Sequence, residues 1–213
     1  IIGLGFEQLV YGGLTKVFAG IIIAPIGGVI FGMVLVGIII AVFAKYRPAV
    51  VNRTFGRLSI ISSAWLALTH GANDGQKTMG IIVLILFSAG IISEIHMPLW
   101  VILAAASAMG LGTFFGGYKV IKTLGLKITR LKPYQGFAAQ TGGGVMLAIF
   151  AILGIPASTT HAITGSVMGA GAARRIRAVR WRVSRQIIFS WVITIPGAAG
   201  LAIAFTYIIH LFV

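Results

Sequence analysis

A polar segment at residues 68–80 (LTHGANDGQKTMG) interrupts an apolar run that extends from residue 58 to residue 89. Its centre holds Asn73 and Asp74, an amide beside a carboxylate. Asp74 is one of three carboxylates in the chain, and it is the one with hydrophobic sequence on both sides. Because a charge at bilayer depth costs roughly 3–15 kcal/mol, the sequence predicts that Asp74 contacts an ion or a substrate.

A second polar segment, residues 156–161 (PASTTH), carries three hydroxyls in a row after a proline. We expect a helix to begin near Ser158, with its first free N–H groups pointing inward. We also expect the glycines at 71 and 75 to break the first run, so that a half-helix begins near Gly75 with Asn73 or Asp74 as its cap. Two helix N-termini that face each other form a site for an anion.

Asp74 would repel such an anion unless a cation lay between them. Carboxylate, amide and hydroxyl oxygens are hard ligands that suit Na⁺. Lys77 would reduce the charge imbalance at the same place. The two polar segments together therefore predict a paired anion and cation site.

Each polar group also has a purely structural interpretation. Serine and threonine hydroxyls in membrane helices bond back to their own helix, and an Asn-Asp pair can cap a helix. Gln140 could join one helix to its neighbour, and His70 and His161 could be packed side chains. The six arginines between residues 172 and 186 are interpreted as an orientation signal that contacts lipid.

The elements that hold these segments are predicted to be membrane helices. The chain of 213 residues is 58% hydrophobic and 9% charged, whereas soluble domains carry about 25% charged residues. This composition predicts an all-α, polytopic membrane protein. The net charge of +14 comes from basic residues that flank apolar spans, which indicates orientation in a membrane rather than nucleic-acid binding.

Lysine and arginine concentrate in three segments of the chain. Residues 45–57 carry four, residues 119–132 five and residues 172–186 six, which leaves only Lys16 and Lys77 elsewhere. The positive-inside rule places all three segments in the cytoplasm. Membrane spans are then expected at 17–44, 58–89, 98–118 and 187–213, the second of them as a broken helix.

Residues 136–171 begin and end at cytoplasmic segments, so they must enter the membrane and return. Two arms, 137–153 and 158–171, would span about 25 and 21 Å as helices. Neither arm crosses a ~30 Å hydrocarbon core comfortably. We therefore predict a re-entrant helical hairpin whose tip, around Pro156, lies near the middle of the membrane.

A weak internal repeat indicates two related halves. Residues 2–5 (IGLG) resemble residues 168–171 (MGAG), and the proline-containing segment 23–27 resembles 193–197 in a span of opposite direction. This pattern is typical of inverted-repeat transporters. The predicted regions are the end of a first repeat with a scaffold helix (1–57), a transport region (58–171), and a basic segment with the final scaffold helix (172–213).

Residues 69–77 (THGANDGQK) and 156–165 (PASTTHAITG) resemble the second copies of the two signature motifs of the inorganic phosphate transporter (PiT) family. The resemblance extends over nearly the whole chain. Members of this family carry each motif twice, in two inverted halves, and cotransport phosphate with Na⁺ or H⁺. The chain, which does not begin with Met, thus resembles the C-terminal half of a bacterial-type member, and Gln76 and Lys77 match the bacterial form.

The resemblance implies an ion-coupled phosphate symporter of the plasma membrane, which works by alternating access and is not an enzyme. It needs no cofactor besides the coupling Na⁺ or H⁺. Its partners are the lipid bilayer, phosphate, the coupling cation and the missing N-terminal half, without which this segment should not transport; a homodimer is left open. The residues expected to bind phosphate are Asp74, Gly75, Gln76, Ser158, Thr159 and Thr160. The residues expected to bind Na⁺ or the coupling proton are Asn73, Asp74, Gln140 and Ser158. The secondary candidates are Lys77 and His161.

Two alternatives stay open. A sulfate permease could share the scaffold, although sulfate lacks the protons that phosphate can donate to Asp74. A membrane metal enzyme could use His70, Asp74 and His161. The first two are spaced i, i+4, which suits a metal only in a continuous helix, and the glycines at 71 and 75 argue against one.

Overall fold

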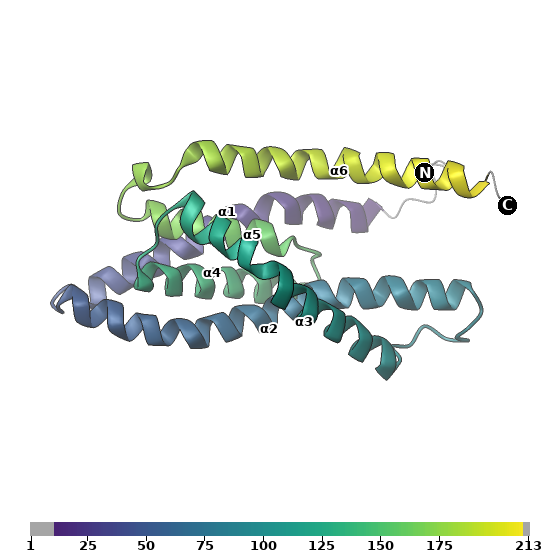
Figure 1. Ribbon diagram of the computed structural model, residues 1–213, viewed down its shortest axis with the longest axis horizontal. Coiled ribbons are helices and arrows are strands. Elements are labelled where there is room, and N and C mark those ends of the chain that lie inside the picture. Colours follow the sequence, from purple (N-terminus) through teal and green to yellow (C-terminus); the bar gives the residue numbers. More distant parts are fainter. Residues whose placement is uncertain (1–10, 211–213) are drawn as a thin grey trace.

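The computed structural model describes residues 11–210, which form α-helices and no strand (Figure 1). A π-helical turn, Thr123–Ile128, follows α3, and a 3₁₀ turn, Ile176–Ala178, precedes α6. The predicted all-α fold is confirmed. The helices are α1 (Tyr11–Val42), α2 (Pro48–Ser88), α3 (Leu99–Lys122), α4 (Pro133–Ile152), α5 (Thr159–Ala172) and α6 (Trp181–His210).

A proline sets the start of α2. Arg47 is extended, with φ −61° and ψ 132°, and Pro48 occupies the first turn of the helix, where its missing N–H is not needed. Residues 48–57, expected to belong to a basic loop, therefore form the first turns of α2. Arginine is a good helix former, so charge alone does not mark a loop.

The predicted break in the run from 58 to 89 is wrong. α2 continues without interruption for 41 residues through Gly71 and Gly75, so no half-helix begins there. Each glycine costs about 1 kcal/mol relative to alanine in a helix. Contact between α2 and α4 offsets this cost, because tertiary packing supplies most of the stability of helices in proteins.

Residues 133–172 form the expected hairpin of two antiparallel helices. Pro133 lies in the first turn of α4, and Gly154, with a φ of 60°, turns the chain after the helix ends. Ser158 is the N-cap of α5, as expected from its place after the proline. The turn lies about half-way along the longer helices (Figure 1). This position suits a re-entrant hairpin, whose depth in a bilayer stays a prediction.

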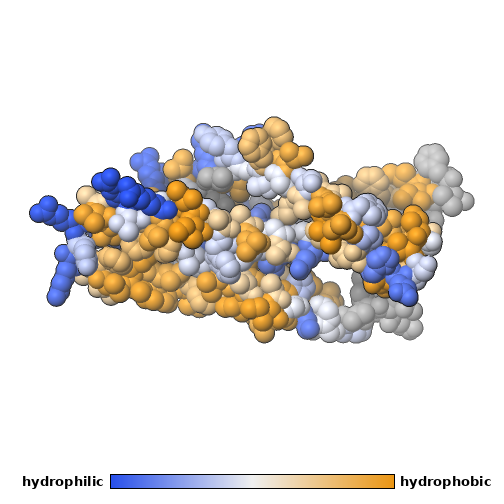
Figure 2. Space-filling model, turned by 90° about the horizontal axis from the view of Figure 1, so that it is seen from below, coloured by the Kyte–Doolittle hydropathy of each residue, from blue (hydrophilic) through white to orange (hydrophobic). Residues whose placement is uncertain are grey.

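The basic segments lie at one end of the molecule. All three connect helices at the left of Figure 1, and hydrophilic residues gather at that end in Figure 2. Their position agrees with the predicted placement on one side of a membrane. Within residues 11–210, the segments long and apolar enough to cross a membrane are Tyr11–Val42, Leu99–Ile128, Pro133–Ile152 and Trp181–Ile209.

Glycines let α1 and α5 approach each other backbone to backbone. A β-carbon added at Gly165 of α5 would collide with the carbonyl group of Pro25 in α1. A β-carbon at Gly28 of α1 would collide with the carbonyl oxygen of Ala162 in α5. Small residues permit such close contacts between membrane helices. α4 packs against both, so α1, α4 and α5 form one unit that holds the start of α5 in place.

The inverted repeat is only partly within the described chain. Residues 2–5 lie outside it, so their similarity to residues 168–171 stays a sequence prediction. α1 and α6, which contain Pro25 and Pro196 of the second repeated pair, run in opposite directions (Figure 1). The predicted division into three regions also stays a prediction, but α1, assigned to the scaffold, packs closely against the hairpin of the transport region.

Candidate functional site

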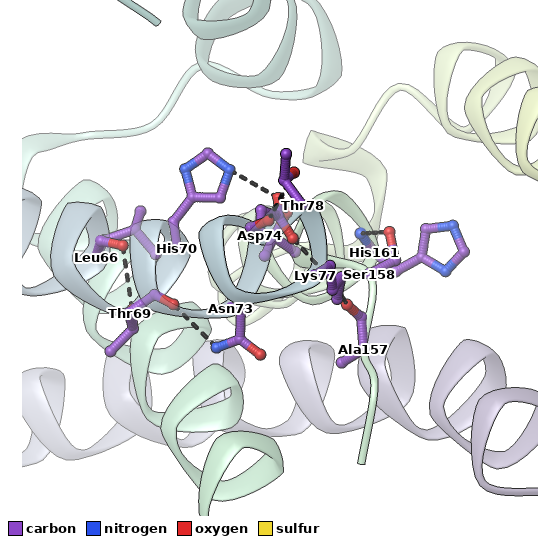
Figure 3. Close-up of polar contacts among 11 residues, drawn as sticks. Leu66, Thr69, His70, Asn73, Asp74, Lys77, Thr78, Ala157, Ser158 and His161 are labelled. Carbon is purple, nitrogen blue, oxygen red and sulfur yellow. Dashed lines mark hydrogen bonds and ion pairs between the residues drawn. The ribbon is translucent and has the colours of Figure 1, made fainter. Parts of the chain in front are cut away.

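Asp74 is the centre of a polar cluster between α2 and the turn of the hairpin (Figure 3). Its Oδ1 lies 3.0 Å from Nζ of Lys77, and its Oδ2 lies 3.1 Å from Nε2 of His70. Thr159, the first residue of α5, donates a hydrogen bond to Oδ2 at 2.8 Å. Both carboxylate oxygens therefore face donors, and the second polar segment reaches the first as the sequence predicted.

The continuity of α2 creates this cluster. His70, Asp74 and Lys77 are spaced i, i+4 and i+7, so they lie on one face of an unbroken helix. The i, i+4 spacing of His70 and Asp74 was noted in the sequence, but it was discounted because the glycines were expected to break the helix. In the continuous helix this spacing makes His70 a neighbour of Asp74.

Lys77 joins α2 to the turn before α5. Its ammonium group donates to the backbone carbonyl oxygen of Ala157 as well as to Asp74 (Figure 3). Ala157 is buried, whereas the side chains of Lys77 and Asp74 are 41% and 33% exposed. The junction between the two helices is therefore polar and partly exposed in this chain.

Asn73 does not cap a half-helix, as one expectation had it. Its buried side-chain nitrogen donates to the carbonyl oxygens of Thr69 at 2.9 Å and of Leu147 at 3.3 Å. The first bond lies within α2 and the second reaches α4. Asn73 thus holds these helices together instead of capping a half-helix, and its place among cation ligands stays a prediction.

The hydroxyls at the start of α5 point in different directions. Thr159 is buried against Asp74, whereas Ser158 accepts a hydrogen bond from the backbone N–H of His161 at 3.4 Å. Ser158, exposed Thr160 and His161 line a cavity of about 880 Å³ between α1, α5 and α6. The ring of His161 packs against the ring of Trp191 of α6 at the wall of this cavity, with ring centroids 3.9 Å apart.

Of the other predicted ligands, Gln140 does not reach Asp74. Gln140 of α4 accepts a hydrogen bond from Ser62, which lies about 18 Å before Asp74 along α2. Gln140 therefore joins neighbouring helices, which was its structural interpretation. Gly75 is buried beside the side chains of Met79 and Met109. Gln76 is exposed on α2, and phosphate binding by these two residues stays a prediction.

The three residues of the metal-enzyme alternative do not meet, because His70 contacts Asp74 but His161 lies apart from both (Figure 3). Figure 3 shows His161 pointing away from Asp74 and His70. In the described part of the chain, no three side chains of His, Cys, Asp or Glu form a group that could hold a metal ion. What the arrangement offers instead is one carboxylate, an ammonium group and a helix N-terminus at a single junction, a combination suited to small ions.

Comparison with known proteins identifies the family. The model of the "Phosphate transporter family" matches residues 41–202. A "Probable low-affinity inorganic phosphate transporter" of Rhizobium meliloti (strain 1021) is 46% identical over 92% of this chain and 59% of its own length. A protein of the same name from Bacillus subtilis (strain 168) is 37% identical over 99% of this chain and 64% of its own length. The chain belongs to the phosphate transporter family, and the relatives it matches are named as transporters, not enzymes.

A solved structure has the same fold. The structure titled "The sodium-dependent phosphate transporter" matches with a TM-score of 0.78 at 22% identity, over 92% of this chain and 66% of that chain. This likeness supports the arrangement of the helices. The chain spans 59% and 64% of the length of the two curated relatives above.

Proposed function

We propose that this chain forms part of an ion-coupled inorganic phosphate symporter of the plasma membrane, with its three basic segments in the cytoplasm. The observation that carries this proposal is the bond between Asp74 and Thr159, which joins the two polar motifs 85 residues apart in the sequence. The names of the relatives support phosphate as the substrate. The remaining part of the symporter would complete the other side of the site.

Phosphate would bind at the N-terminus of α5. The first N–H groups of a helix lack partners within it and favour an anion. Ser158 uses its oxygen to accept from a backbone N–H, so its hydroxyl hydrogen is free to donate to phosphate. Thr160 is exposed beside it, and Lys77 supplies positive charge on the other side of the turn.

The packing favours a particular division between moving and fixed helices. α1, α2, α4 and α5 pack against one another, whereas α6 lies across the 880 Å³ cavity from α1 and α5 and is exposed along most of its length. We infer that alternating access moves these four helices together past α3 and α6. This places α1 with the transport region instead of the scaffold.

Uptake into liposomes tests the proposed function. The natural gene product that contains this chain would be reconstituted, and labelled phosphate uptake measured with a Na⁺ gradient, a pH gradient or neither. Sulfate at equal concentration is the control anion. We expect uptake of phosphate that exceeds uptake of sulfate and that needs one of the gradients. Equal uptake of the two anions would favour the sulfate permease, and uptake without any gradient would exclude coupling.

Chemical labelling tests the proposed topology. The chain contains no cysteine, so Lys132→Cys and Arg174→Cys each introduce a single thiol. Both residues are exposed at the two ends of the hairpin. We expect both thiols to react with an impermeant maleimide from the cytoplasmic side. Reaction from opposite sides would mean that the hairpin crosses the membrane.

A further inference from the structure

The ammonium group of Lys77 lies among oxygen atoms. It bonds to Oδ1 of Asp74 at 3.0 Å and to the backbone carbonyl oxygen of Ala157. Oδ2 of the same carboxylate is occupied by the hydroxyl of Thr159 and the ring of His70. Every cationic or hydrogen-donating contact of Asp74 is therefore supplied by side chains of this chain.

This set of oxygens is one that a hard cation would also use. Carboxylate, carbonyl and hydroxyl oxygens are typical ligands of such ions. The lysine ammonium group is a compact point charge with three donors, so it can replace a small cation among two or three oxygens. A mobile Na⁺ that approached Oδ1 of Asp74 and the carbonyl of Ala157 would have to displace Lys77 first.

We propose that Lys77 is a tethered cation that takes the place of Na⁺ at Asp74, so that residue 77 determines the cation requirement of this site. The inference rests on the proposed function, because it concerns the coupling ion of that same site. It makes uptake by the natural protein independent of Na⁺. It also means that a neutral residue at position 77 opens the oxygens of Asp74 and Ala157 to Na⁺.

The first test compares phosphate uptake in NaCl with uptake in an equal concentration of choline chloride, at one fixed pH gradient. We expect the natural protein to transport equally in both. Lys77→Gln keeps a similar length but lacks the charge, and we expect its uptake to be about tenfold faster in NaCl. Lys77→Arg retains the charge and should remain indifferent to Na⁺. The matched control is Lys127→Gln, which removes an exposed lysine outside the site.

The second test does not depend on transport. An ion that binds only the folded state raises the apparent Tm. In detergent, replacing choline with Na⁺ should raise the Tm of Lys77→Gln by about 2–4 °C more than that of the natural protein or of Lys127→Gln. This comparison measures whether the loss of the lysine creates a Na⁺ site.

The outcomes separate this proposal from the proposed function. Uptake by the natural protein that requires Na⁺ would overturn the tethered cation, and so would a Lys77→Gln variant whose response to Na⁺ equals that of the natural protein in both assays. If Lys77→Gln does not fold, the comparison of uptake by the natural protein in NaCl and in choline chloride decides the proposal. If no variant transports phosphate under any gradient, the proposed function fails, while the Tm comparison still decides the role of residue 77.

Discussion

The two sides of α5 are held in different ways. On the side of α1, glycine meets backbone carbonyl groups, as at Gly165 against Pro25. On the side of α2, few residues touch, and the contact depends on the hydroxyl of Thr159 and the carbonyl of Ala157, both bonded to polar side chains. The first contact is dry and formed by the main chain, whereas the second is polar and partly exposed.

The contact of α5 with α1 fixes the position of the helix, whereas the polar contact of α5 with α2 can break and form again. Where backbone meets backbone, no side chain can change rotamer, so movement requires the helices to slide past each other. At Asp74, which is 33% exposed, water or an ion can replace a side-chain donor without moving a helix. We therefore expect changes on the α1 side to alter stability most, and changes on the α2 side to alter transport as well as stability.

The largest effect on transport is expected from Asp74→Asn. The amide keeps the size of the side chain but removes the charge that faces Lys77, and loss of a hydrogen-bonded charge partner weakens function by about 100-fold. We expect this loss in gradient-driven phosphate uptake by a variant that remains folded. The control is Glu94→Gln, which removes an exposed carboxylate between α2 and α3. Undiminished uptake by Asp74→Asn at every pH and Na⁺ concentration would show that the carboxylate has no part in coupling.

The largest effect on stability is expected from Gly165→Ala. The added methyl group would overlap the carbonyl group of Pro25, and overpacking of this kind lowers the free energy of unfolding by about 1–3 kcal/mol. Gly110→Ala in α3 is the matched control, since nothing lies within 4 Å of its added β-carbon. That variant should be stabilised by up to about 1 kcal/mol through helix propensity.

Unfolding in mixed micelles, followed by circular dichroism, measures both glycine variants. The folded fraction of Gly165→Ala should bind phosphate with unchanged affinity, because the variant leaves the polar side of α5 intact. An unchanged free energy of unfolding would mean that α1 and α5 are less closely packed than the structure shows.

Hydrophobicity, basic segments and proline predicted much of the fold from the sequence. The hairpin followed from its basic flanks and two short apolar arms, and the cap at Ser158 followed from Pro156. The break in α2 was predicted wrongly because the two glycines were given more weight than packing against α4. A glycine costs a helix about 1 kcal/mol relative to alanine. The packing of α2 against α4 stabilises the helix by more than this.

The wrongly predicted break in α2 also limited the prediction of the site. The meeting of Asp74 with Thr159 was expected, whereas the neighbours of Asp74 on its own helix depended on the continuity that was missed. Gln140 was placed among the ion ligands, with a bond to a neighbouring helix as its structural interpretation. Its partner, Ser62, lies 78 residues away in the sequence and could be found only once α2 and α4 were placed side by side.

A smaller effect is expected from Thr159→Val, which tests the polar contact without removing a charge. Valine has the shape of threonine but cannot donate to Asp74. Loss of a hydrogen bond to a partly exposed carboxylate should cost about 1–2 kcal/mol in the free energy of unfolding. Thr160→Val is the neighbouring control, because Thr160 is exposed and its substitution should change stability by less than about 0.5 kcal/mol. Equal effects of the two substitutions would contradict the geometry at Asp74.

The smallest effect is expected from Ser158→Ala, and it separates two roles of one hydroxyl. As an N-cap, Ser158 accepts a long bond of 3.4 Å from His161, so its loss should cost about 0.5–1 kcal/mol without phosphate. If the hydroxyl also donates to bound phosphate, the natural protein gains more stability from phosphate than Ser158→Ala does. The difference between their free energies of unfolding should then grow by up to about 1 kcal/mol as phosphate is raised to saturation. We expect the difference to grow, because Ser158 acts only as an acceptor in the cap and its hydroxyl hydrogen remains available to donate.

Unfolding measured across a phosphate titration distinguishes the two roles of Ser158. Ser190→Ala is the matched control, because Ser190 donates to the carbonyl oxygen of Gln186 within α6 and lies outside the site. Its deficit should stay constant at every phosphate concentration. A constant deficit for Ser158→Ala as well would limit Ser158 to capping α5. The anion would then depend on the backbone N–H groups of the helix and on Lys77, and the polar side of α5 would bind phosphate without a serine ligand.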